Sequence, residues 1–187
     1  MSTTTATPTN NSTRAALRSE DGNHEKFLTF CLGQEAYGLP ILVVREIIGM
    51  IDVTPLPRTP AYVKGVINLR GKIIPVIELR AKFGLPSVPI TQETCIVVVE
   101  VTSTERAGTY QLGVIVDAVR EVLDIRRDSI EPPPVFGGGI PMTFVMGMGK
   151  VRDRVVILLD INRIGLIGEL EAVEQSSGQA EPGAAAA

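Results

Sequence analysis

Arginine, asparagine and lysine side chains gather in the middle of one apolar stretch, in an arrangement that suits recognition better than catalysis. The stretch covers residues 65–80, where two runs rich in β-branched residues flank Arg70-Gly71-Lys72. This pattern predicts a β-hairpin, because a glycine between charged neighbours supplies the positive φ of a tight reversal. Asn68 and Arg70 must then reach water or a partner at the mouth of the hairpin. Arg70 is therefore either the leading recognition residue or a solvated turn arginine.

Residue types that carry out catalysis or bind metals are sparse. The single histidine, His24, lies at the edge of a polar N-terminal arm, which leaves Ser/His/Asp and Cys/His triads and histidine-rich metal sites without a histidine. Asp117 follows an apolar run and is the carboxylate most open to an enzymatic role. No second carboxylate or base has a motif-like spacing to it, so a strand-end cap or an ion pair is the simpler interpretation. The sequence predicts no catalytic residue, no metal site and no cofactor.

Two further features of the sequence have structural interpretations. Gly147-Met148-Gly149-Lys150 has a faint likeness to a phosphate-binding loop, but Val151 follows where Ser or Thr is required, so a turn is expected. The cysteines, Cys31 and Cys95, lie far apart in strand-like apolar runs. They are predicted to be reduced core thiols of a cytoplasmic protein.

The elements that must position these residues are mostly short strands. Apolar runs and period-two alternation predict strands at residues 27–32, 95–101, 110–116 and 119–125, and a last hairpin over 144–149 and 155–159. Pro75 has no N–H, which places the second arm of the 65–80 hairpin at a sheet edge or on a bulge. Residues 40–51 are ambiguous by composition, but the spacing of their apolar residues predicts a helix that begins at Pro40. Single helical turns are expected at 79–83 and after Asp160.

Length and composition restrict the class of protein. The 187 residues are 44% hydrophobic, which is ample for a core, and no apolar run approaches the roughly 20 residues of a membrane span. A net charge of −3 and few aromatic residues argue against a nucleic-acid surface. Residues 1–24 and 175–187 are predicted to be disordered arms around an ordered region at 25–174, and no export signal is expected.

Four blocks in this order resemble the CheW family of bacterial chemotaxis coupling proteins. They cover residues 39–49, 60–71, 74–80 and 113–117, and the run Lys64-Gly65-Val66-Ile67-Asn68-Leu69-Arg70-Gly71 is the most specific of them. The resemblance spans nearly all of the ordered region. It implies a mainly β fold of two small, intertwined SH3-like five-stranded β-barrels around a shared hydrophobic core, with a few short helices and disordered termini. The second set of strands is expected from about residue 94.

The same resemblance implies an adaptor without catalytic activity. Such proteins link the cytoplasmic tips of chemoreceptors to the CheA histidine kinase, whose regulatory domain has the same fold and alternates with CheW in rings. Other CheW copies are a further partner in these rings. The chain is then expected in the cytoplasm, associated with membrane receptor arrays through its partners, without nucleic acid or direct membrane insertion. A CheW-like scaffold of a related chemosensory or surface-motility pathway is the alternative.

Site residues follow from the resemblance, position by position. A receptor-binding groove between the barrels would take Arg70, Glu46, Val44, Gly65 and Val122. Val44 and Val122 are equally open to a packing role. Gly65 would act by lacking a side chain where a partner or a neighbouring strand comes close.

A second surface would bind the kinase and form the ring contact. The resemblance assigns Glu131, Val135 and Phe136 to it, and an apolar pair on a stiff proline stem suits a small docking site because little entropy is lost on binding. Two features depart from the family pattern. Residues 136–143 are longer than the barrels require, and Ile48 stands where an arginine is common.

Overall fold

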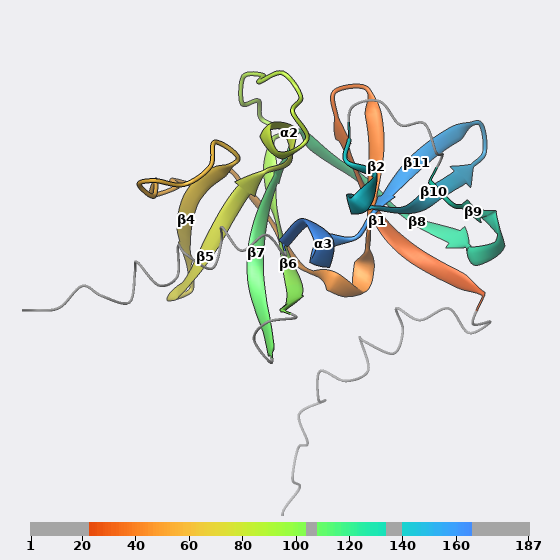
Figure 1. The fold of residues 1–187 in the computed structure, drawn as a ribbon, viewed down its shortest axis with the longest axis horizontal. Helices are drawn as coiled ribbons and strands as arrows, with labels where there is room; N and C mark the ends of the chain where they lie inside the picture. Colours follow the sequence, from red (N-terminus) through yellow and green to blue (C-terminus); the bar gives the residue numbers. More distant parts are fainter. Residues whose placement is uncertain (1–22, 104–107, 134–139, 166–187) are drawn as a thin grey trace, which may run out of the picture.

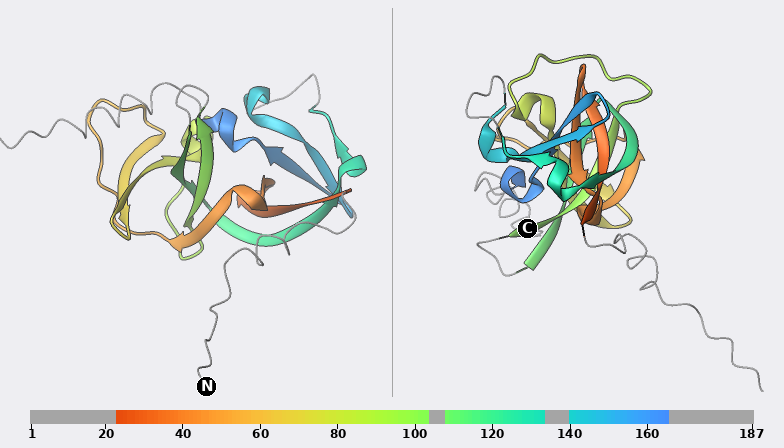
Figure 2. Two further views of the ribbon diagram at one scale, coloured as in Figure 1. Left: turned by 90° about the horizontal axis from the view of Figure 1, so that it is seen from below. Right: turned by 90° about the vertical axis from the view of Figure 1, so that its right-hand side faces the viewer.

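Two curled β-sheets lie side by side in the computed structural model, which describes residues 23–103, 108–133 and 140–165 (Figures 1 and 2). The six-stranded sheet has the order β8(Ala118–Arg126), β1(His24–Leu32), β2(Glu35–Pro40), β11(Arg154–Leu159), β10(Val145–Val151) and β9(Ile130–Glu131). The five-stranded sheet has the order β3(Val44–Gly49), β6(Cys95–Ser103), β7(Gly108–Val116), β5(Lys72–Glu78) and β4(Val63–Leu69). Short helices are η1(Ile41–Val43), α2(Leu79–Lys82), η2(Arg127–Ser129), η3(Met142–Phe144) and α3(Ile161–Gly165).

The mainly β prediction with few short helices is confirmed, but the chain divides between the sheets differently from expectation. The five-stranded sheet uses only residues 44–116, whereas the six-stranded sheet combines residues 24–40 with 118–159. Residue 94 thus lies inside the segment of the five-stranded sheet. The reason is that β1 pairs with β8, so the first hairpin joins strands from the far end of the chain. The two-residue β9 adds the sixth strand by pairing with β10. Residues 1–22 of the predicted arm 1–24 and all of the predicted arm 175–187 lie outside the described residues, whereas His24 already begins β1.

The largest apolar core lies between the two sheets and draws on both. It contains Phe30, Tyr37 and Leu39 from one sheet and Val97 and Leu112 from the other, all fully buried. Aromatic rings continue across it, with centroids of Phe30 and Tyr37 5.8 Å apart and those of Tyr37 and Phe83 6.0 Å apart. A second core fills the inside of the five-stranded sheet, around Ile67, Ile74 and Ile96. A third one fills the inside of the other sheet. The sheets are therefore held together mainly by apolar burial.

The 65–80 hairpin is confirmed as β4 and β5. Leu69 stands opposite Lys72, so Arg70 and Gly71 form a two-residue turn. Both have positive φ, 52° at Arg70 and 82° at Gly71. Two positive φ values match the right-handed twist of the flanking strands. The turn therefore keeps an arginine in a left-handed conformation that costs about 1–2 kcal/mol outside glycine.

The helix predicted over residues 40–51 is wrong. Only η1 is helical there, Pro40 ends β2, and residues 44–49 form the edge strand β3. The argument for a helix is that in a strand Arg45 and Glu46 point to opposite faces, so that each face carries a charged residue among its apolar residues. Each of them instead has an oppositely charged partner, Glu100 for Arg45 and Arg70 for Glu46. With both charges paired at an edge, the β-branched residues of the segment are free to adopt their preferred extended conformation.

Of the two positions predicted from Pro75, the sheet edge is wrong, because β5 lies between β4 and β7, and the irregularity in the pairing of β4 with β5 lies between Val63 and Gly65. Pro75 stands opposite Val66, and the backbone N–H and C=O of Val66 bind Thr54 on the far side of β4. Pairing with β7 begins only at Val76. The proline therefore precedes the stretch in which β5 needs donors toward β7.

Other local predictions are confirmed, except the turn expected at residues 147–150. The helical turn after Glu78 is α2, and the last hairpin is β10 and β11. The carboxylate of Asp160 accepts a hydrogen bond from the backbone N–H of Asn162 at 3.0 Å, at the start of α3. The glycine motif at 147–150 lies within β10 and not in a turn, since the reversal comes after it.

Candidate docking surfaces

Arg70 and Glu46 form a bidentate ion pair at the surface. Nη1 and Nη2 of Arg70 donate to the two carboxylate oxygens of Glu46 at 2.8 and 2.7 Å. The Arg70 side chain is 76% exposed and that of Glu46 28%. Glu46 is on β3 and Arg70 follows β4, the two edge strands of the five-stranded sheet. The pair thus joins the two edges of this sheet and presents a guanidinium to solvent.

Asn68, the other polar side chain of the hairpin, supports the turn. Its Oδ1 accepts a hydrogen bond from the backbone N–H of Gly71 at 2.9 Å. A side-chain bond of this kind stabilises the reversal that carries Arg70. Asn68 therefore positions the recognition candidate.

Gly65 lies where another segment of the chain comes close. Its φ is +139°, and a Cβ built there would lie 1.9 Å from the backbone O of Thr54. Thr54 forms two backbone hydrogen bonds of 2.9 Å with Val66, which extends the sheet beyond β4. Of the two roles considered for Gly65, the structure supports close approach by a neighbouring strand.

The two valines assigned to the receptor-binding groove differ in environment. Val44 is half-buried at the start of β3 and packs against the core between the sheets. Val122 lies on β8 of the six-stranded sheet, stands opposite Leu28 and is 49% exposed. The structure thus brings Arg70 and Glu46 into contact and places Val122 on the other sheet. Ile48, at the position where an arginine is common, packs against the second core.

The proposed kinase surface is described only in part. Glu131 is in β9 opposite Met148, and its carboxylate accepts a hydrogen bond from Lys150 at 2.7 Å. Val135 and Phe136 lie outside the described residues, as do residues 137–139 of the long segment. Glu131 itself belongs to the six-stranded sheet.

Asp117 is an ion-pair partner, as the simpler interpretation predicted. It accepts hydrogen bonds from Nε and Nη2 of Arg80 at 2.8 and 2.7 Å, and from the backbone N–H of Gly33 at 2.7 Å. The hydrogen bonds from Arg80 lower the pKa of the Asp117 carboxyl, against the effect of its burial. Sequence reasoning missed Arg80, because its partner is 37 residues away. The ionised carboxylate is a structural anchor.

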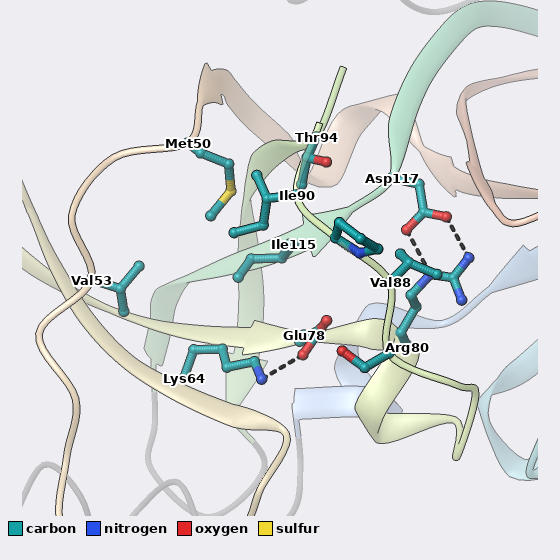
Figure 3. A pocket seen from close by; sticks show the side chains of 12 residues that line it. Met50, Val53, Lys64, Glu78, Arg80, Val88, Ile90, Thr94, Ile115 and Asp117 are labelled. Carbon is teal, nitrogen blue, oxygen red and sulfur yellow. Dashed lines mark hydrogen bonds and ion pairs between the residues drawn. The ribbon is translucent and has the colours of Figure 1, made fainter. Parts of the chain in front are cut away.

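A pocket of about 360 Å³ opens beside this ion pair (Figure 3). Its apolar wall comes from Met50, Val53 and Ile115, and a second ion pair, Lys64 with Glu78 at 2.6 Å, lies on the other side. These pocket charges are already paired with one another. Across residues 23–103, 108–133 and 140–165, no cluster of three or more His, Cys, Asp or Glu could hold a metal ion. No helix in the same residues is long and apolar enough to span a membrane.

Comparison with known proteins matches this architecture. The family model of the CheW-like domain covers residues 26–165. The chain belongs to the CheW family. It is 37% identical over 150 residues to the chemotaxis protein CheW of Klebsiella aerogenes, covering 80% of this chain and 87% of the relative. For the CheW of Rhizobium meliloti the identity is 32% over 160 residues, covering 86% and 99% of the two chains.

A solved CheW structure has the same fold. The crystal structure of the scaffolding protein TtCheW from Thermoanaerobacter tengcongensis superimposes with a TM-score of 0.69 at 37% identity, covering 78% of this chain and 90% of that one. The chain is accordingly a chemotaxis adaptor of the CheW family, a scaffold and not an enzyme. Membership explains why the charged groups described above are paired with each other and do not converge on a reaction centre.

Replacing Gly65 with Ala tests its structural role. The new methyl group would collide with the Thr54 carbonyl in a backbone conformation that L-residues avoid, so we expect a loss of about 2 kcal/mol or more in the free energy of unfolding. Urea denaturation measures it. Gly49→Ala is the matched control, because Gly49 is in β3 and has no atom within 4 Å of its Cβ position. Equal stability of the two variants would contradict the assignment.

The Asp117 anchor predicts a pH dependence of stability. A carboxyl with a depressed folded-state pKa contributes stability above its unfolded pKa of about 3.9, and this stability is lost as the pH falls below that value. We expect the difference in unfolding free energy between the parent chain and Asp117→Asn to narrow by about 1 kcal/mol between pH 6 and pH 3. Urea denaturation at each pH is the measurement, and a constant difference would refute the depressed pKa.

Proposed function

We propose that this chain couples the cytoplasmic tips of chemoreceptors to the CheA histidine kinase in bacterial chemotaxis. Arg70 and Glu46 lie at the centre of the receptor-binding surface, with Val44, Gly65 and Val122 assigned to its surroundings by resemblance. Glu131, Val135 and Phe136 form the surface for the regulatory domain of the kinase and for ring contacts, including contacts with other CheW copies. The protein then works in the cytoplasm and is held at membrane receptor arrays by its partners.

The exposed Arg70–Glu46 pair is the observation that carries this proposal. Glu46 uses two of the five N–H donors of Arg70, and the side chain remains 76% exposed. A guanidinium fixed in this way can bind a partner's acceptor with little further loss of side-chain entropy. The strained turn conformation at Arg70 also fits a functional position.

The kinase surface has a weaker but compatible basis. Glu131 and Lys150 are about 60% exposed, at 58% and 60%, and an exposed pair of this kind contributes only about 0–1 kcal/mol. Glu131 can therefore exchange Lys150 for a cation on a partner at low cost. The apolar residues Val135 and Phe136 follow the stiff proline run 132–134, which suits a small apolar contact.

Exchanging the charges of Arg70 and Glu46 distinguishes a role in receptor binding from a role in joining the two edges of the five-stranded sheet. Arg70→Glu would face Glu46 with a like charge, so we expect binding of a receptor-tip fragment to fall by about tenfold or more, together with some loss of stability. In the double variant Arg70→Glu/Glu46→Arg the opposite charges face each other again, so stability should recover while receptor binding does not. Isothermal titration and urea denaturation provide the two measurements. If the double variant recovers receptor binding, the pair serves only to join the two edge strands of the sheet.

The division into two surfaces predicts a selective loss at Phe136. Replacing Phe136 with Ser should weaken binding of the kinase regulatory domain by about tenfold, because an apolar anchor is removed, and should leave receptor binding unchanged. Titration against each partner separately measures this. Ile73→Ser, at a 60% exposed position of the other sheet, is the matched control. Equal loss of both partners in Phe136→Ser would contradict the division.

The second candidate is a CheW-like scaffold of a related chemosensory or surface-motility pathway. Ile48 favours it, because this side chain packs into the second core at a position where an arginine is common in the family. Such a change at the edge strand β3 alters the surface beside Glu46. Co-precipitation of the tagged chain from its own cells, with identification of the receptor, distinguishes the two pathways.

A further inference from the structure

We infer that Arg80 and Asp117 lock a hinge between the two sheets, and that Arg80 is a positioning residue which fixes the two docking surfaces relative to each other. The inference rests on the proposed function for its biological purpose. The lock itself is a property of the structure that can be measured without any partner.

The hinge is the single residue Asp117. β7 of the five-stranded sheet ends at Val116, and β8 of the six-stranded sheet begins at Ala118 (Figure 1). The only other passage between the sheets in residues 23–103, 108–133 and 140–165 is the η1 segment between β2 and β3. A rotation of one sheet against the other therefore has to be absorbed at Asp117 and η1. Domain hinges are typically a few such terminal residues of regular elements.

Four segments of the chain meet at the Arg80–Asp117 ion pair. Arg80, in α2, donates two hydrogen bonds to the carboxylate and a third from Nη1 to the carbonyl of Pro86 at 2.8 Å. Gly33, in the turn between β1 and β2, donates its backbone N–H to the same carboxylate. Figure 3 shows the Arg80 and Asp117 side chains pointing toward each other at one side of the pocket. The contacts thus tie the hinge residue to both sheets at once.

Burial and geometry make this contact directional. Arg80 is only 8% exposed, and a bidentate guanidinium–carboxylate pair holds its two planes in one orientation. Gly33 allows the approach, since its φ is +66° and a Cβ there would lie 3.3 Å from Nη2 of Arg80. The apolar burial between the sheets is non-directional by comparison. The core therefore keeps the sheets together, and the ion pair determines their angle.

The angle matters because the Arg70–Glu46 centre of the receptor surface and Glu131 of the kinase surface are on different sheets. Arg70 and Glu46 belong to the five-stranded sheet, and Glu131 belongs to the six-stranded one. Neither surface contains Arg80 or Asp117. A change at Arg80 should consequently leave the Arg70–Glu46 pair and Glu131 intact and disturb mainly the simultaneous formation of the two contacts.

A distance measurement between the sheets tests the lock directly. Spin labels on cysteines introduced at Ile73 and Val155, both more than half exposed and one on each sheet, report the distance in a Cys31→Ala/Cys95→Ala background. We expect one narrow distance in this labelled parent, and loss of that narrow distance when Arg80→Met is added. Arg45→Met is the matched control, because the pair of Arg45 with Glu100 lies within one sheet. An unchanged distribution in Arg80→Met would overturn the inference.

A second variant keeps the test sharp if Arg80→Met folds poorly. Asp117→Asn keeps an acceptor for the Gly33 N–H and loses the charge that Arg80 needs, so it should broaden the distance to a smaller extent. If neither variant broadens the distance distribution, the lock is refuted. It is also refuted if the broadening only equals that of Arg45→Met.

Partner binding then links the lock to the function. In Arg80→Met the affinity for a receptor-tip fragment alone and for the kinase regulatory domain alone should stay within about threefold of the parent, while assembly of all three components falls by about tenfold or more. Unimpaired assembly in a variant with a broadened distance would show that the lock has no role in coupling. If the parent binds neither partner, the proposed function fails, while the distance result still decides the lock.

Discussion

Burial of apolar side chains between the two sheets is the constraint on which the rest of the molecule depends. Phe30, Tyr37 and Leu39 cannot be covered by their own sheet alone, and Val97 and Leu112 of the other sheet complete the core. The hydroxyl of the fully buried Tyr37 has a partner, because it donates to Glu35 at 2.5 Å. Burial and this carboxylate raise the pKa of Tyr37 far above its ordinary value. The hydroxyl thus remains a donor at any physiological pH.

Charged groups are left at the margins of this core, and their pairing shapes the surface. Arg70 with Glu46, Lys64 with Glu78 and Arg80 with Asp117 each join two different elements of the fold. The exposed fraction of the basic side chain falls from the first pair to the last. An adaptor needs this combination, because exposed pairs can be shared with a partner and buried ones hold the geometry in which the partner is met.

Local signals in the sequence predicted local structure well. The 65–80 hairpin, the last hairpin and the capping role of Asp160 each depend on residues only a few positions apart, and each is confirmed. The helix predicted for residues 40–51 failed because its test was the fate of Arg45 and Glu46, whose partners are Glu100 and Arg70. Apolar spacing alone cannot reveal partners 24 to 55 residues away.

The site residues show the same contrast between local signals and contacts with residues distant in sequence. Arg70 could be singled out because a turn of charged residues between apolar arms is visible in sequence, and Asp117 could be interpreted as an ion-pair carboxylate by elimination. Arg80 gave no signal, since a buried arginine in a helical turn is recognised only once its acceptor is known. Gly65 lay between two explanations until the position of Thr54 showed which strand approaches it.

The left-handed turn at Arg70 has a consequence for how this surface can change. Gly and Asn adopt a backbone φ of 52° with less strain than other residues. Replacing Arg70 with Asn would therefore reduce the strain of the turn while removing the guanidinium. Folding stability and partner affinity therefore favour opposite residues at one position. Substitutions selected only for thermal stability would therefore replace Arg70 and weaken recognition. A thermostable variant of this scaffold should keep the residues of this turn.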